Sequence, residues 1–87
     1  MFHYLDFLLD YIYMKYILQS LLIPRSLFTL NQAKKWIKDN NYKDHYQNKS
    51  VHITKNYYRF RQHKPNKNLI YKTKKLPNGI TLILQRI

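Results

Sequence analysis

The apolar pattern predicts a first strand over residues 16–23. This run is rich in Ile, Leu and Tyr, and Pro24 ends it because proline has no backbone N–H to donate to a sheet. Apolar side chains occupy both parities of the run, with Ile17, Leu21 and Ile23 on one and Leu18 and Leu22 on the other. Both faces of the strand would then be covered, so we expect it to be central in its sheet.

A helix is predicted next, from residue 30 to about residue 40. Thr29 offers an N-cap, and Gln32, three residues on, completes a capping box. Apolar side chains recur at helical spacing at Leu30, Ala33, Trp36 and Ile37. Trp36 is expected to anchor the core, and the Asn pair at 40–41 tolerates the left-handed conformation that stops a helix.

The second half of the chain predicts strands. Residues 42–50 have the polar composition of a loop, and 51–53 alternate with the first and last side chains facing inward. From Tyr57 the alternation continues, but the inward positions now have even numbers, so that Tyr58 and Phe60 face inward. A bulge or tight turn at 54–56 would reset the register between the two runs.

Two further strands are predicted at 69–76 and 80–87, joined by a turn at 77–79. Pro-Asn-Gly in that turn supplies a fixed φ followed by two residues that tolerate positive φ. We therefore expect an antiparallel, three-stranded meander in the C-terminal half. The predicted fold class is α+β: a single small domain of β-α-β-β(-β) order with one principal helix, preceded by a short apolar helix.

That leading helix is predicted over residues 1–13, at the start of a mostly apolar segment. Asp6, Asp10 and Lys15 interrupt the segment, and each would cost about 2.5 to 3.5 kcal/mol at the centre of a bilayer. There is no positive start and no Ala-x-Ala cleavage pattern, so we expect neither a transmembrane span nor secretion. The helix would dock on a partner or on the protein's own sheet through an apolar stripe formed by Phe2, Leu5, Leu9 and Ile12.

Charge narrows the range of partners. The chain of 87 residues has a formal net charge of +12, and the stretch from His45 onward holds ten Lys or Arg and no acid. Such a charge favours contact with nucleic acid, anionic lipid or an acidic protein. A second explanation stays open, because a bias toward Lys, Asn, Ile and Tyr also follows from A/T-rich codons.

The sequence offers few residues that could act in catalysis or bind a metal ion. Four acidic residues are too few for a paired-carboxylate hydrolase or a two-metal site, and the four histidines show no ligand spacing. There is no cysteine, and the single glycine does not form a phosphate-binding loop. We expect no catalytic residue, no metal and no cofactor, so an enzyme is the least favoured class.

One candidate binding surface follows from alternation in the Arg-rich strand. It places Tyr57, Arg59, Arg61 and His63 on one face, and Lys72, Lys74 and Lys75 on the next strand would extend a cationic track. Arginine binds phosphate with a planar fork and tyrosine offers a ring for base stacking, as in sequence-tolerant nucleic-acid binders. In the alternative, the long helix covers this face, the arginines pair internally and the lysines only prevent aggregation.

The sequence also resembles a known group of proteins. The matching segments are LQSLLI at 18–23, FTL at 28–30, AKKWI at 33–37, YYRFRQ at 57–62 and YKTKKLPNGI at 71–80. In this order they resemble small uncharacterised proteins of giant, mimivirus-like amoebal DNA viruses, with related segments in tailed phages. The resemblance covers 14–87 and implies a viral origin and a compact β-α-β-β unit, but no activity. Residues 1–13 fall outside it, which makes Met14 an alternative start.

The function expected from these observations is that of a small basic viral accessory protein, located in the host cytoplasm or the virion. It would bind nucleic acid non-specifically through the basic and aromatic strand face. The alternative is a virion-associated or protein-interaction module that meets a viral or host protein through the Phe2 stripe and the surface around Tyr57. The choice between DNA and RNA and the oligomeric state stay open.

Overall fold

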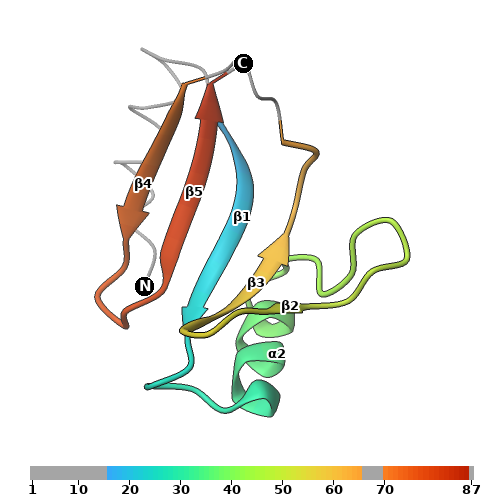
Figure 1. Ribbon diagram of the computed structural model, residues 1–87, viewed down its shortest axis with the longest axis vertical. Coiled ribbons are helices and arrows are strands. Elements are labelled where there is room, and N and C mark those ends of the chain that lie inside the picture. The colour runs from blue at the N-terminus through green and yellow to red at the C-terminus, as the bar shows by residue number, and fades with distance from the viewer. Residues whose placement is uncertain (1–15, 66–69, 87) are drawn as a thin grey trace.

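The computed structural model describes residues 16–65 and 70–86, which form a five-stranded antiparallel sheet and one helix (Figure 1). The elements are β1 (Tyr16–Pro24), α2 (Leu30–Asp39), β2 (His52–Ile53), β3 (Tyr57–Arg61), β4 (Tyr71–Lys75) and β5 (Thr81–Arg86). The predicted α+β class and the order of the elements are confirmed. The helix expected at 1–13, with its apolar stripe, lies outside the described residues.

The strands are arranged in the order β2-β3-β1-β5-β4, so β1 is central, as predicted. Leu21 on β1 is paired with Phe60 on β3 and with Leu82 on β5. The predicted adjacency of β3 and β4 is wrong, because β1 and β5 lie between them. Only β4 and β5 of the expected meander form a hairpin, since the apolar run of β1 offers both of its edges to partner strands.

The core lies between α2 and one face of the sheet. Leu21, Phe60 and Leu82 are aligned across three neighbouring strands and are each at most 1% exposed. Ala33 and Ile37 from α2 belong to the same buried cluster. Figure 1 shows α2 behind the sheet, near the ends of β1 and β3, so the opposite face of these strands is turned away from the helix.

The ends of α2 follow the predicted capping pattern. The Thr29 hydroxyl accepts a hydrogen bond from the Gln32 backbone N–H (3.2 Å), and the Gln32 side-chain carbonyl accepts one from the Thr29 N–H (2.9 Å). At the other end Asn41 has φ 63°, the left-handed conformation expected there. Trp36 is partly buried against the core and stacks on Tyr42, with ring centroids 5.8 Å apart.

Both predicted turns are present. Between β2 and β3, the Thr54 N–H donates to the Tyr57 carbonyl (2.8 Å) and the Tyr57 N–H donates to the Thr54 hydroxyl (3.0 Å). In the β4–β5 turn Gly79 has φ +93°, a conformation that L side chains rarely adopt. Ile53 is paired with the buried Tyr58 and so lies on the helix side, as predicted, but it is 49% exposed because β2 is a two-residue edge strand with a neighbour on one side only.

Candidate functional site

The two faces of β3 have opposite chemical character. Tyr58 and Phe60 are buried on the helix side, whereas the alternating positions Tyr57, Arg59 and Arg61 face the other way. The split predicted from alternation is therefore present. The alternative in which the helix covers the arginines is contradicted, because Phe60 belongs to the same core cluster as Ala33 and Ile37 of α2.

Strand register identifies the neighbours of the two arginines. Leu22 on β1 and His52 on β2 are paired with Arg59, and Ser20 on β1 is paired with Arg61. Paired side chains on one face are neighbours across the strands. We call the sheet surface opposite α2 the open face; its members are His52, Tyr57, Arg59, Arg61, Ser20, Leu22, Thr81, Ile83, Gln85, Tyr71, Thr73 and Lys75.

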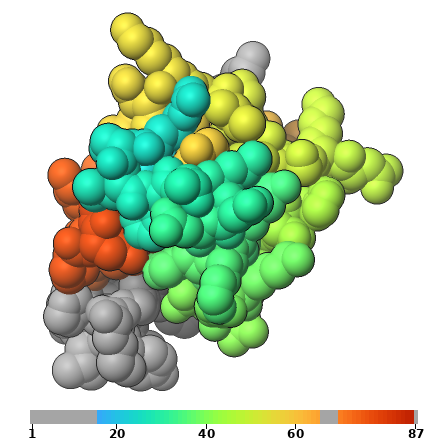
Figure 2. Space-filling model, turned by 90° about the horizontal axis from the view of Figure 1, so that it is seen from below, coloured from blue at the N-terminus to red at the C-terminus, as the bar shows by residue number. Residues whose placement is uncertain are grey.

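A hairpin in the segment after α2 forms the outer wall of a cleft next to β3. The backbones of Tyr46 and Lys49 exchange two hydrogen bonds (2.8 and 3.0 Å), and the two residues between them, Gln47 and Asn48, have φ 50° and 62°. Positive φ at both central positions is the geometry of a tight two-residue turn. In Figure 2 this yellow-green segment stands out from the body of the molecule.

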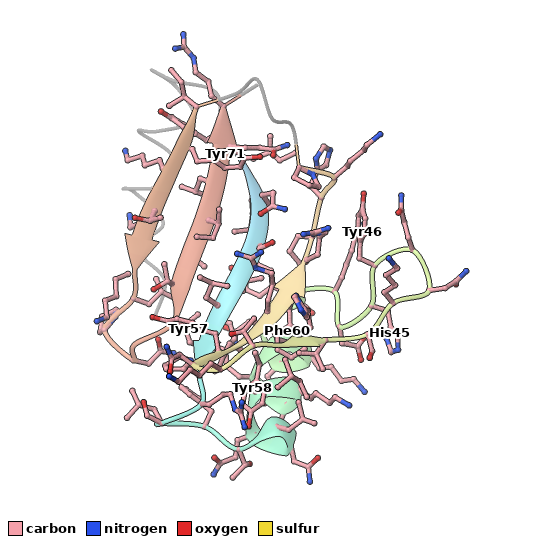
Figure 3. All side chains as sticks on the ribbon, viewed as in Figure 1. His45, Tyr46, Tyr57, Tyr58, Phe60 and Tyr71 are labelled. Atoms are coloured by element: carbon pink, nitrogen blue, oxygen red, sulfur yellow. The ribbon has the colours of Figure 1, made fainter. Side chains whose placement is uncertain are left out.

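The cleft has a volume of about 620 Å³, and we call it the basic cleft. It is lined by Tyr46, Gln47, Lys49, Ser50, Val51, His52, Arg59 and Arg61. Figure 3 shows the Tyr46 side chain rising from the hairpin alongside β3. The lining therefore combines two guanidinium groups, an ammonium group, an imidazole and a phenol ring, and it includes no carboxylate.

Two buried side-chain atoms in the described residues lack a hydrogen-bond partner: Arg59 Nε and Ser20 Oγ. Register places both residues on the open face, on the neighbouring strands β3 and β1. A buried donor without a partner is unfavourable, and a guanidinium N–H is among the strongest donors in proteins. Arg59 also lines the basic cleft, where its guanidinium group can donate to an oxygen atom of a ligand.

The acidic residues of the described segments lie elsewhere. Asp39 accepts from Lys35 Nζ (2.7 Å), and Asp44 lies 3.6 Å from Lys38 Nζ and 3.0 Å from His45 Nδ1. The hydrogen bond from His45 is the main cause that holds the pKa of Asp44 below its usual range. Carboxylates thus neutralise charge around α2 and leave the cations of the basic cleft without a counter-charge.

The seven predicted site residues do not form one surface. Arg59 and Arg61 line the basic cleft, and Tyr57 is on the same face where β3 begins. Lys75 is also on the open face but on β4, three strand spacings or about 14 Å from β3. Lys72 and Lys74 are paired with Leu84 and Leu82 and thus lie on the helix side; the expected track from β3 to β4 is not formed.

The predicted site residue His63 makes a structural contact, and Tyr71 lies far from the cleft. His63 follows the end of β3, and its Nδ1 lies 3.1 Å from Gln85 Nε2, so the ring helps to join this segment to β5. Tyr71 begins β4 at the end of the sheet opposite Tyr57 (Figure 3). The rings of Tyr57 and Tyr71 therefore cannot form one stacking platform.

The sequence prediction missed six of the residues that line the basic cleft, among them the three with a ring or a basic group: Tyr46, Lys49 and His52. Residues 42–50 were expected to be a featureless loop, but Gln47-Asn48 is a two-residue turn, and Asn tolerates positive φ. His52 has the parity of Arg59 once the two short strands are paired through the turn at 54–56. Pairing the two runs as a hairpin would have placed His52 on the face of the arginines.

Comparisons with protein-family models, with curated proteins and with solved structures find no match. Among residues 16–65 and 70–86, no group of three His or Asp side chains could hold a metal ion. In the same part of the chain, no helix has the length and apolar character needed to cross a bilayer. Any function must therefore be argued from the open face and its cleft.

Proposed function

We propose that the protein binds single-stranded nucleic acid with little sequence preference, through the basic cleft and the adjoining part of the open face. The observation that carries this proposal is the juxtaposition of Arg59 and Arg61 on one strand face, at a cleft that also includes Lys49 and His52 and has no carboxylate. Uncompensated cations at a concave site attract a polyanion and release its counterions.

The chemistry of the lining suits a single strand. Arg59 and Arg61 donate to phosphate oxygens, and the rings of Tyr46 and Tyr57 offer flat surfaces on which unpaired bases stack. Stacking depends little on base identity because every base has a π-face. Binding is therefore the proposed activity, with no catalytic step; the viral origin implied by the resemblance stays a prediction on which the proposal does not depend.

Fluorescence anisotropy with a labelled single-stranded oligonucleotide tests the proposal directly. We expect binding at about 50 mM salt that weakens steeply toward about 200 mM, because each phosphate contact to a single strand contributes a slope of roughly 0.7 in log K against log salt. Single-stranded DNA, single-stranded RNA and duplex DNA of equal length should be compared. No binding at low salt, or an affinity indifferent to salt, contradicts the proposal.

A matched pair of double variants separates the site from net charge. Arg59→Gln with Arg61→Gln removes two cations from the open face, and Lys34→Gln with Lys35→Gln removes two from α2. We expect the first pair to reduce affinity at least about tenfold and to lower the salt slope, and the second to have a much smaller effect. Equal losses would mean that only the total charge matters.

A protein-interaction module is the second candidate, and exposed apolar side chains favour it. Leu27 is 63% exposed, Ile53 49% and Tyr57 37%. Soluble proteins expose single apolar residues routinely, so these side chains indicate an interaction surface only if a protein partner binds them. Light scattering and a pull-down from virions, repeated with Leu27→Ser, test it; a persistent monomer without a partner counts against it.

A further inference from the structure

Cations on the open face are concentrated at one edge of the sheet. From β3 toward β4, the row that contains Arg59 continues through Leu22 and Thr81 before it reaches Lys75, and the row of Arg61 continues through Ser20, Ile83 and Thr73. The middle of the face is therefore neutral. A row of diester phosphates, each with one negative charge, would be matched by cations spread along the face. One group of higher charge matches a local cluster better.

Three segments contribute basic side chains to the basic cleft. Arg59 and Arg61 come from β3, His52 comes from the edge strand β2, and Lys49 comes from the hairpin wall. His52 is directly opposite Arg59 in the register, so the imidazole and the guanidinium group are cross-strand neighbours in the cleft. The cleft is thus built to accept more than one unit of negative charge from several directions.

The guanidinium group of Arg59 adds a geometric requirement. A guanidinium group that donates from Nε and one Nη presents a fork, and this fork matches two oxygens of the same phosphate. Arg59 is one of the residues that line the cleft, so its guanidinium group can offer such a fork to a ligand. A volume of about 620 Å³ is also within the range of pockets that hold small ligands, so a phosphate with its attached sugar fits.

We propose that the basic cleft binds the terminal phosphate monoester of a nucleic-acid strand. Such a phosphate carries close to two negative charges and three oxygens that accept hydrogen bonds, whereas a phosphate within the strand carries one charge. Arg59 donates the fork, Lys49 and Arg61 supply the additional charge, and the ring of Tyr46 lies beside the first base or sugar. This inference rests on the proposed function, because the strand itself is held by the adjoining open face.

Paired oligonucleotides test the inference. The same single-stranded sequence is prepared with a 5′-phosphate, with a 3′-phosphate or with two free hydroxyl ends, and the label is placed at the end that is not varied. We expect a phosphate at one of the two ends to raise the affinity of the wild-type protein at least about tenfold, as one additional charge-assisted hydrogen-bond contact would. A free nucleoside monophosphate should compete far more weakly than the phosphorylated strand.

Arg59→Lys keeps the charge but removes the fork, and it should abolish the preference while salt-dependent binding of the unphosphorylated strand persists. Lys75→Gln, at the far edge of the same face, should leave the preference unchanged. If Arg59→Lys does not fold by circular dichroism, Lys49→Gln takes its place, since Lys49 is on the exposed hairpin outside the sheet. The Lys49→Gln substitution removes one positive charge from the cleft without altering β3.

The outcomes separate this inference from the proposed function. Equal affinity for the phosphorylated and unphosphorylated strands, with salt dependence retained, overturns the terminal-phosphate site and leaves nucleic-acid binding in place. A nucleoside monophosphate that competes as well as the phosphorylated strand also overturns it, because the strand would then contribute nothing. Failure of every strand to bind overturns both.

Discussion

α2 and β3 carry the same kind of charge in opposite surroundings. On α2, Lys35 is 2.7 Å from Asp39, and Lys38 is 3.6 Å from Asp44 in the segment that follows. On β3, Arg59 and Arg61 have no carboxylate near them in the basic cleft, and their cross-strand neighbours are Leu22, His52 and Ser20. A net charge of +12 is therefore uninformative until the location of the few acids is known.

The difference also teaches how one strand serves two purposes. The buried side of β3 fixes its position through Tyr58 and Phe60, and this leaves the opposite side free to carry groups that do not stabilise the fold. Lys35 and Lys38 on α2 have carboxylate partners nearby, as is usual for charges on a solvent-exposed helix. Unpaired arginines on a rigid strand are the arrangement expected of a binding surface.

The largest effect is expected from removing the support of β3. Phe60→Ala deletes a ring that is 1% exposed, and such changes cost about 3 to 5 kcal/mol of the free energy of unfolding. In a domain this small that loss leaves little stability, so urea denaturation should show a mostly unfolded protein. Arg61→Ala, one position along the same strand, should change the free energy by less than about 1 kcal/mol. Similar losses for both would show that Arg61 is structural.

An acidic residue in the basic cleft should partly neutralise its positive charge, as the carboxylates near α2 do for the helix lysines. Ser50→Glu places a carboxylate in the lining, and Asn31→Glu places one in the first turn of the helix as a control of equal charge. We expect Ser50→Glu to weaken oligonucleotide binding about tenfold and Asn31→Glu to weaken it less than about twofold, because screening is strong beyond about 10 Å. Anisotropy titrations measure both, and an equal effect of the two variants would remove the distinction between the regions.

Neutralising the two regions should change stability in opposite directions. At low salt, Arg59→Gln with Arg61→Gln relieves repulsion and raises the free energy of unfolding, whereas Lys35→Gln with Lys38→Gln breaks two surface ion pairs and lowers it. Each change should be about 0.2 to 1 kcal/mol and should shrink at about 1 M salt. Urea denaturation at two salt concentrations measures it. A loss of stability in the arginine variant would indicate that its side chains pack against the sheet.

The smallest effect is expected from Asp44. Its pKa is lowered in the folded protein, chiefly by the hydrogen bond from His45, so its contribution is present above the unfolded pKa and is lost as the pH falls through the folded value. The difference in stability between the wild type and Asp44→Asn should therefore be present at neutral pH, begin to fall near about pH 4 and be lost only below the lowered folded pKa of Asp44. Urea denaturation across this range measures it, and His45→Gln should reduce the difference at neutral pH.

Features that depend on neighbouring residues in the sequence could be predicted. The Thr29–Gln32 capping box, the turn at Gly79 and the division of β3 into a buried and an exposed side are local consequences of side-chain chemistry. Each is fixed by hydrogen bonds or alternation within a few residues. For this reason Arg59 and Arg61 could be predicted from the sequence as members of the candidate site.

The rest depends on which strands become neighbours. Alternation within β4 cannot reveal that β5 and β1 separate it from β3, so the face and the distance of Lys72 and Lys74 were misjudged. The cleft likewise depends on the hairpin of Tyr46 and Lys49 standing beside β3, a contact between segments that the sequence separates. Such contacts follow from packing of the whole domain and have no local signature.

The central position of β1 has a consequence for biosynthesis. β1 emerges from the ribosome before every other strand of the sheet, yet one of its edges is filled only by β5, the last strand to be made. Throughout translation of the intervening elements, this apolar strand has a vacant edge to which another nascent copy can add. The β1 edge is therefore covered only after β5 has been synthesised and has paired with it.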